Sequence, residues 1–179
     1  MGINRLAGIW GVAEATVFFI VPDVWLSIVG RNKLRVGLIA CFYSLAGALI
    51  GGVFMYYWGS TDQHSANQFL DKIPAINSEL IKDVNHQLIE QGLVAVLFGP
   101  LSGTPYKIYA VQVAGQGLSI WIFMLISIIA RLMRFTLVTS LCHYALKIVN
   151  RVIDKKYNLK ILLAGWFAFY LFYFTVMGI

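Results

Sequence analysis

Charged side chains are scarce in this sequence. Only 12% of its 179 residues are Asp, Glu, Lys or Arg, whereas 59% are hydrophobic. Soluble globular domains average roughly 25% charged residues, so this chain has too few to cover a surface that faces water. Together with a mean hydropathy of +0.75, this composition predicts an integral membrane protein. The length suits one compact bundle of roughly four to six membrane segments, without a second domain.

Cysteine, histidine and proline are also few. Cys41 and Cys142 lie inside apolar runs without CxxC spacing, so we expect inert thiols and not a disulfide or metal site. The three histidines form neither an HxxxH nor an HExxH motif, and we expect no metal and no other cofactor. The apolar stretch at the N-terminus carries Glu14 and leads into more membrane sequence, which is not typical of a cleavable signal peptide. No strand-like alternation occurs, which predicts an all-α protein.

Three stretches predict membrane-spanning helices. Residues 36–58 and 161–179 contain no charged side chain, and each is long enough to cross the ~30 Å hydrocarbon core as a helix. Residues 118–146 are uncharged apart from Arg131 and Arg134. We therefore expect one continuous helix there that carries two buried or interfacial arginines.

Two further apolar segments, residues 6–30 and 92–115, contain helix-breaking residues near their middle. In the second, residues 98–107 have the sequence FGPLSGTPYK. Irregular backbone at membrane depth is tolerated only where it is buried in protein or lines a cavity. Both segments are thus predicted to be re-entrant hairpins, each of which enters and leaves the membrane on one side. The residues expected to break the helices are Pro22, Pro100, Gly103 and Pro105.

Residues 60–91 are the only long polar stretch. Ser60 and Gln63 have the spacing of a capping box, Asn77 can cap a second helix, and Gly92 is a stop signal. Apolar residues recur at helical spacing between Asn77 and Gly92. The stretch predicts two short amphipathic helices that lie on the membrane surface or over the bundle.

Charge placement predicts the topology. Residues 31–35 and 147–160 are basic loops, whereas residues 60–91 are mainly acidic. Since basic loops favour the cytoplasm, we expect the first two on the cytoplasmic face of the cell inner (plasma) membrane and the third outside. If residues 6–30 and 92–115 both crossed the membrane, the two basic loops would lie on opposite faces, so the charge pattern favours the re-entrant interpretation.

The predicted order contains an inverted repeat. A broken hairpin followed by a spanning helix occurs at residues 6–58 and again, upside down, at residues 92–146, with 161–179 as an additional C-terminal helix. Inverted repeats with discontinuous helices place a substrate near the bilayer midplane, where the ends of half-helices meet. The fold class expected is therefore an all-α integral membrane protein built from this repeat.

Five ionisable side chains lie inside the apolar segments, where each costs at least ~2.5–3.5 kcal/mol. They are Glu14 and Asp23 in the first hairpin, Lys107 in the second, and Arg131 and Arg134 on the following helix. The cations are expected to bind an anionic head group, and the carboxylates to take up and release protons, because burial favours a protonated carboxyl group. Two hydroxyl residues of the second hairpin are expected to satisfy broken backbone and contact the substrate without acting as nucleophiles: Ser102 and Thr104.

Each of these residues also has a structural alternative. For Glu14 the alternative is a place at the membrane interface, for Asp23 a cap on the second half of its hairpin, and for Lys107 an extension outward to the head groups. For Arg131 and Arg134 it is a role as ordinary interfacial anchors. In each case the alternative predicts a side chain that reaches solvent, lipid head groups or its own backbone.

The two broken segments resemble those of the DedA family of membrane proteins, also called VTT or SNARE-associated domain proteins. In the first half, the features that carry the resemblance are an acidic residue, a Pro-Asp pair and a glycine before a spanning helix: Glu14, Pro22-Asp23 and Gly30. In the second half, FGPLSGTPYK followed by Ala114-Gly115 is similar to the second hairpin motif of the family. The resemblance covers roughly residues 6–146.

This resemblance implies two hairpins that meet at the bilayer midplane and transport of lipids across the bilayer, which in bacterial relatives includes proton-dependent recycling of a polyprenyl-phosphate carrier. Glu14 and Asp23 match the family's acidic pair, and Lys107 matches its second basic position. The chain departs from the pattern where Gly99-Pro100 replaces a usual arginine, and its acidic pair is more tightly spaced. Arg131 or Arg134 would have to supply the missing charge.

We therefore expect a transporter or flippase for an anionic lipid or lipid-linked phosphate, and not an enzyme. A small-solute or ion transporter of the same fold and a non-catalytic assembly subunit are the alternatives; a lipid-phosphate enzyme would require a His/Asp or Arg/His cluster that the sequence lacks. Membrane lipids with phosphate head groups are the expected partners, and nucleic acid is not. Gly47 and Gly51 form a GxxxG motif, which indicates close packing inside the bundle more than a homo-oligomer site.

Overall fold

The computed structural model describes residues 2–177, and the side chains of residues 100–102 and 177 lie outside that description. Within the described residues the chain is helical and contains no strand, which confirms the all-α prediction there. Three of its helices are long and apolar enough to cross a membrane: α3 (Leu34–Thr61), α8 (Ile120–Val149) and α9 (Asn158–Met177), the last with the short η1 (Lys155–Tyr157) ahead of it. They contain nearly all of the three predicted spans.

The first broken segment forms two short helices, α1 (Ile3–Thr16) and α2 (Asp23–Gly30), around a non-helical break. α1 runs parallel to α3, since Gly47 lies against the Gly8 carbonyl and Gly51 against Ala15. The chain then folds back, because the Trp25 indole of α2 donates to the Ile3 carbonyl at the start of α1. At 1.5 Å per residue, even α1 with its 14 residues extends only about 21 Å.

The second broken segment forms α6 (Val94–Ser102) and α7 (Tyr106–Gly115). The prediction that Pro100 interrupts the helix is wrong, because the backbone of α6 continues through Pro100 to Ser102. Pro100 lacks the N–H that would bond one turn back, and the helix ends two residues later. The break lies at residues 103–105, where Gly103 has a φ of +83° that residues with a Cβ rarely adopt.

The breaks of the two helix pairs meet beside the middle of α3. Gly51 packs against Ala15 near the end of α1, and its neighbour Gly52 makes room for the Tyr106 ring at the start of α7. A Cβ at Gly52 would lie 2.4 Å from the Tyr106 hydroxyl. The small residues that predicted a helix-packing face therefore admit α1 on one side of α3 and α7 on the other.

The polar stretch forms α4 (Gln63–Leu70) and α5 (Ser78–Gln91), which pack over α7 at one end of the bundle. The predicted Asn77 cap is confirmed, since its side chain accepts from the Leu80 N–H at 2.8 Å. The predicted Ser60 cap is wrong: α3 extends beyond Ser60, and Asp62 instead accepts from the Ser65 N–H at 3.0 Å. The boundary between α3 and α4 therefore lies later than predicted, because α3 is longer than its uncharged stretch.

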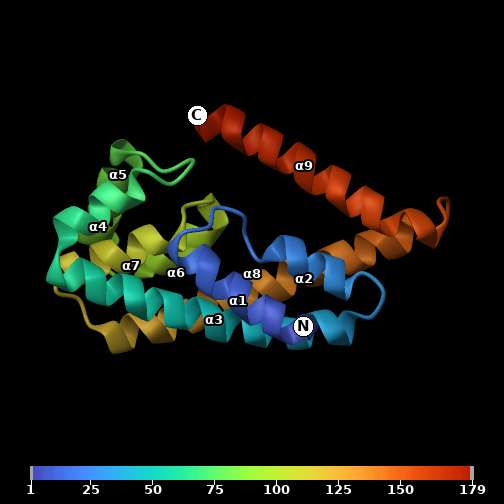
Figure 1. Ribbon diagram of the computed structural model, residues 1–179, viewed down its shortest axis with the longest axis horizontal. Helices are drawn as coiled ribbons and strands as arrows, with labels where there is room; N and C mark the ends of the chain where they lie inside the picture. Colours follow the sequence, from blue (N-terminus) through green and yellow to red (C-terminus); the bar gives the residue numbers. More distant parts are fainter. Residues whose placement is uncertain (1, 178–179) are drawn as a thin grey trace.

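α8 runs back along the bundle, and α9 stands apart from it. Thr139 of α8 lies against Gly30 and Gly37, and His143 bonds to the Gly30 carbonyl at 2.9 Å, so the two basic loops lie at the end of the bundle opposite α4 and α5. Figure 1 shows α9 (red) set at an angle beside the other helices, and little of it is buried.

Candidate functional site

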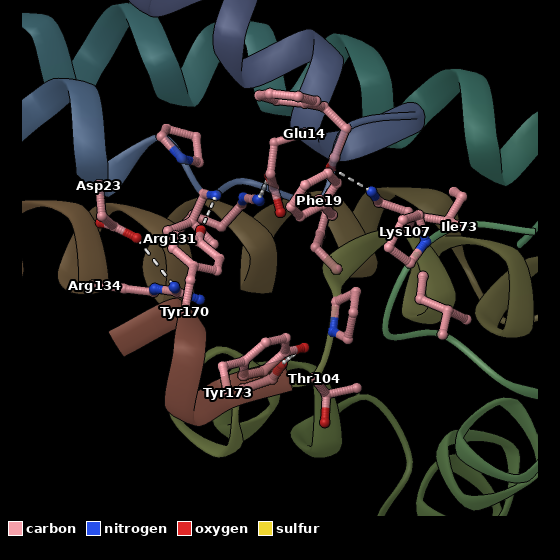
Figure 2. Close-up of a pocket in the computed structure, with 18 of the residues that line it drawn as sticks. Glu14, Phe19, Asp23, Ile73, Thr104, Lys107, Arg131, Arg134, Tyr170 and Tyr173 are labelled. Carbon is pink, nitrogen blue, oxygen red and sulfur yellow. Dashed lines mark hydrogen bonds and ion pairs between the residues drawn. The ribbon is translucent and has the colours of Figure 1, made fainter. Parts of the chain in front are cut away.

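A small charged cavity lies where the two breaks meet. Its volume is about 60 Å³, enough for a few water molecules. Its wall is formed by both helix pairs, by α8 and α9, and by the loop between α4 and α5. All five of the predicted ionisable residues line it. Figure 2 shows these side chains, which come from segments up to 120 residues apart, gathered around one space. The ionisable residues are Glu14, Asp23, Lys107, Arg131 and Arg134. The structure thus brings them together, while their roles remain predictions.

Glu14 and Arg131 form a closed ion pair. Both terminal guanidinium nitrogens of Arg131 donate to Glu14 Oε2, Nη1 at 3.0 Å, and the two side chains are only 8% and 5% exposed. The guanidinium also lies 4.2 Å from the centre of the Tyr106 ring and 5.4 Å from that of Phe135, an arrangement in which the aromatic faces stabilise the cation. Neither side chain reaches the surface of the protein, whereas the interfacial alternative predicted that both would.

Asp23 and Arg134 form a second, more open pair. Arg134 Nη2 lies 3.0 Å from Asp23 Oδ2; the aspartate is fully buried, whereas 23% of the arginine side chain is exposed. Neither carboxylate oxygen of Asp23 accepts a hydrogen bond of good geometry within the described residues. The capping alternative for Asp23 is also wrong, since Pro22 occupies the N-cap position of α2 and no side-chain capping hydrogen bond forms there.

Lys107 connects the two helix pairs. Its ammonium group donates to the Phe18 carbonyl in the first break at 2.7 Å, and only 1% of the residue is exposed, so it does not extend outward as the alternative predicted. Among the described residues Lys107 forms no ion pair with a carboxylate. With two acidic and three basic side chains, the cavity therefore carries a formal charge of +1, and Lys107 is the cation that no carboxylate balances.

The remaining predicted residues are placed as follows. Thr104 is buried and lines the cavity, as do Pro22, Gly103 and Pro105 of the two breaks. The side chains of Ser102 and Pro100, in contrast, lie outside the described ones. Pro22 and Pro105 are each the N-cap residue of a second half-helix, so the N-terminal ends of α2 and α7 both adjoin the cavity.

Several aromatic residues of the cavity were not predicted. Tyr106 contacts Arg131, the Tyr170 hydroxyl accepts from the Val21 N–H at 2.8 Å, and the Tyr173 hydroxyl lies 3.5 Å from the Gly103 carbonyl. The α9 residues had a detectable signal: Trp166, Tyr170 and Tyr173 recur at helical spacing, and each carries a polar tip on an otherwise apolar helix. Such a stripe indicates a face that meets polar groups inside the protein.

Taken together, the cavity combines excess positive charge, two helix N-termini and aromatic walls. Helix N-termini favour anions because their free N–H groups and dipoles are positive. Enclosure by protein strengthens these interactions, since water does not screen them. The arrangement is thus suited to hold one small anionic group, and the two carboxylates give it sites that can exchange protons.

The three long apolar helices are compatible with a multi-pass membrane protein. No family model, curated protein or solved structure matches the chain.

Proposed function

We propose that this protein is a membrane transporter that moves an anionic lipid or lipid-linked phosphate between the two leaflets. The observation that carries the proposal is the charged cavity itself, in which side chains from both broken helix pairs and from α8 converge. Burying five ionisable groups among apolar helices is costly, and structural packing alone would not require an excess cation there. The resemblance to the DedA family leads to the same proposal.

The proposal places α1–α2 and α6–α7 as re-entrant hairpins that enter from opposite sides. Two features support this placement. None of the four helices is long enough to cross the ~30 Å core, the longest having 14 residues. In both pairs the second helix follows a proline and ends at a glycine, Gly30 or Gly115, as an inverted repeat would require.

The same placement gives a topology. The basic loops at residues 31–35 and 147–160 would face the cytoplasm, and residues 60–91 the other side of the inner (plasma) membrane. This arrangement is supported by the position of both basic loops at one end of the bundle, with α4 and α5 at the other.

In the mechanism we propose, Lys107 and Arg134 hold the head group and Asp23 changes protonation. When an anionic head group arrives beside Arg134, it competes with Asp23 for the guanidinium. Protonation of Asp23 then removes the like charge and lets the head group replace the carboxylate. The cavity of about 60 Å³ must widen for this step, and α9 is the least buried of the three long apolar helices.

A reconstituted leaflet-exchange assay tests the proposal. Fluorescent tail-labelled phosphatidic acid is followed in vesicles by quenching of the outer leaflet, with Lys107→Ala compared with the matched control Lys155→Ala, an exposed lysine far from the cavity. We expect exchange by the wild type and by the control, and at least about a tenfold loss with Lys107→Ala, since a lost charge-assisted contact costs roughly 1.5–3 kcal/mol. Equal exchange by all three proteins would contradict the proposal.

A small-anion transporter is the second candidate, and the small volume of the cavity favours it. The same vesicles test it by uptake of inorganic phosphate. Phosphate uptake without lipid exchange would replace the lipid proposal with this one. A purely structural assembly subunit would instead tolerate neutral substitutions at Lys107 and Asp23 as long as the bundle folds.

A further inference from the structure

A second space, between α8 and α9, adjoins the charged cavity; we call it the lateral groove. It measures about 660 Å³, within the roughly 300–1,000 Å³ range of pockets that hold small molecules. Its walls are predominantly apolar, with Met133, Leu137 and Val138 from α8 facing Leu162, Phe169 and Phe172 from α9.

The groove exists because α9 is held to the bundle by hydrogen bonds on one face. The Trp166 indole donates to Ser27 Oγ at 2.9 Å, and Tyr170 accepts from the Val21 N–H at 2.8 Å. Both partners belong to the first helix pair, so α9 leans on α2 and leaves its side toward α8 uncovered. Two packed helices lie about 8–10 Å apart with interlocked side chains; α8 and α9 do not make such an interface.

The groove and the charged cavity adjoin each other. Asp23, Arg134, Gly103, Phe169 and Tyr173 line both spaces. One part of the groove wall is therefore the Asp23–Arg134 pair, and most of the rest presents hydrocarbon. A molecule that fits both spaces has an anionic head and an apolar tail.

We infer that the lateral groove holds the hydrocarbon tail of a lipid whose anionic head group occupies the charged cavity. This inference rests on the proposed function, because it specifies how that substrate lies. An apolar space of this size left empty forfeits the dispersion contacts of its lining, and the positive charge at its inner end selects a tail attached to an anion. α9 is accordingly the wall past which the lipid enters from the bilayer.

Tail-directed photolabelling tests the inference. The whole protein is reconstituted in phosphatidylcholine vesicles containing phosphatidic acid with a photoactivatable group on its acyl chain, and the labelled residues are mapped by mass spectrometry. We expect adducts on the groove faces of α8 and α9. The lipid-facing Ile50 and Phe54 of α3, both largely exposed, serve as the internal standard that reports a folded protein.

Gly165 provides the blocking variant. It lines the groove, and a Cβ there would meet no atom within 4 Å, so the backbone admits a side chain at this position and Gly165→Trp is chosen to fill the groove. The matched control is Ala168→Trp, on the same helix but outside the groove lining. We expect groove labelling to fall about tenfold in Gly165→Trp, as for a ligand that loses its space, and to be unchanged in the control. If Gly165→Trp alters the α3 standard, Leu137→Trp blocks the groove from the α8 side.

Unchanged groove labelling in a folded blocking variant would overturn the inference, as would a wild type labelled only on α3. Equal groove labelling by the same probe on phosphatidylcholine would also overturn it, because the head group would then play no part. Leaflet exchange is measured in the same vesicles. Exchange without groove labelling would support the proposed function and overturn the tail site. Groove labelling without exchange would support the tail site and contradict the proposed function.

Discussion

The two ion pairs of the charged cavity differ in how completely the protein encloses them. Glu14 and Arg131 are sealed between α1, α8 and the ring of Tyr106. Arg134 remains partly exposed beside its buried partner Asp23 and also faces the lateral groove. The same chemistry, one carboxylate and one guanidinium, therefore occurs once in a closed and once in an open setting.

This difference separates a structural role from a binding role. A buried ion pair is costly to break, because removing one partner leaves the other charge without compensation. The Glu14–Arg131 pair is thus suited to fix the first hairpin against α8. The Asp23–Arg134 pair can exchange partners with an incoming anion, and it is the pair through which we expect substrate and protons to act.

The largest effect is expected from Glu14→Gln. The substitution leaves the Arg131 charge enclosed and unpaired, so we expect the free energy of unfolding in mixed micelles to fall by about 3–5 kcal/mol. The double variant Glu14→Gln with Arg131→Met should recover much of this loss, because no unpaired charge remains. A Glu14→Gln protein as stable as the wild type would show that the closed pair does not hold the hairpin.

Backbone packing should likewise distinguish the tight contact between α1 and α3 from the uncovered groove face of α9. A Cβ at Gly47 would lie 1.9 Å from the Gly8 carbonyl oxygen, whereas one at Gly165 meets nothing. We expect Gly47→Ala to lower unfolding stability by about 1–3 kcal/mol through overpacking, and Gly165→Ala to leave it unchanged or raise it slightly. Thermal unfolding of the two variants side by side measures this, and equal melting temperatures would argue against the tight α1–α3 contact.

Asp23→Asn should lower stability less than Glu14→Gln and Gly47→Ala do, and its main effect should be on transport. Because Arg134 still reaches the groove, we expect the free energy of unfolding to fall by only about 1–2 kcal/mol. Lipid exchange should at the same time lose its response to an imposed pH gradient, because asparagine cannot take up a proton. Exchange by Asp23→Asn that still responds to the gradient would exclude Asp23 as the proton site.

The smallest effect is expected from Trp166→Phe, which removes the hydrogen bond to Ser27 and keeps an aromatic ring. Unfolding stability should fall by about 0.5–1.5 kcal/mol, while proteolysis within α9 should accelerate more than elsewhere. The neighbouring exposed Phe167→Leu serves as the control. Unchanged proteolysis of α9 would mean that this bond does not anchor the helix.

Much of this arrangement could be predicted from the sequence. Uncharged runs indicated the three long helices, and the breakers at Pro22, Gly103 and Pro105 indicated where the short helices separate. Ionisable residues in apolar segments pointed to Glu14, Asp23 and Lys107, since such residues require a partner in the interior. These features are local, so composition and spacing reveal them directly.

What the sequence did not indicate depends on contacts between distant segments. It gave no sign that Arg131 would pair with Glu14 and Arg134 with Asp23, because the spacing along α8 fits either choice. Pro100 did not interrupt α6, which ends instead at the left-handed Gly103. The lateral groove depends on how far α9 stands from α8, which is set by hydrogen bonds from Trp166 and Tyr170 to another helix pair.

Cysteine accessibility tests the central claim most directly, namely that the first hairpin enters and leaves the membrane on one side. Single cysteines replace Gly2, Asn32 and His64, all exposed, in a protein in which Cys41 and Cys142 are changed to alanine. A membrane-impermeant maleimide is then applied to intact cells and to inverted vesicles. The account predicts that positions 2 and 32 are labelled from the same side and position 64 from the other. Labelling of positions 2 and 32 from opposite sides would contradict it.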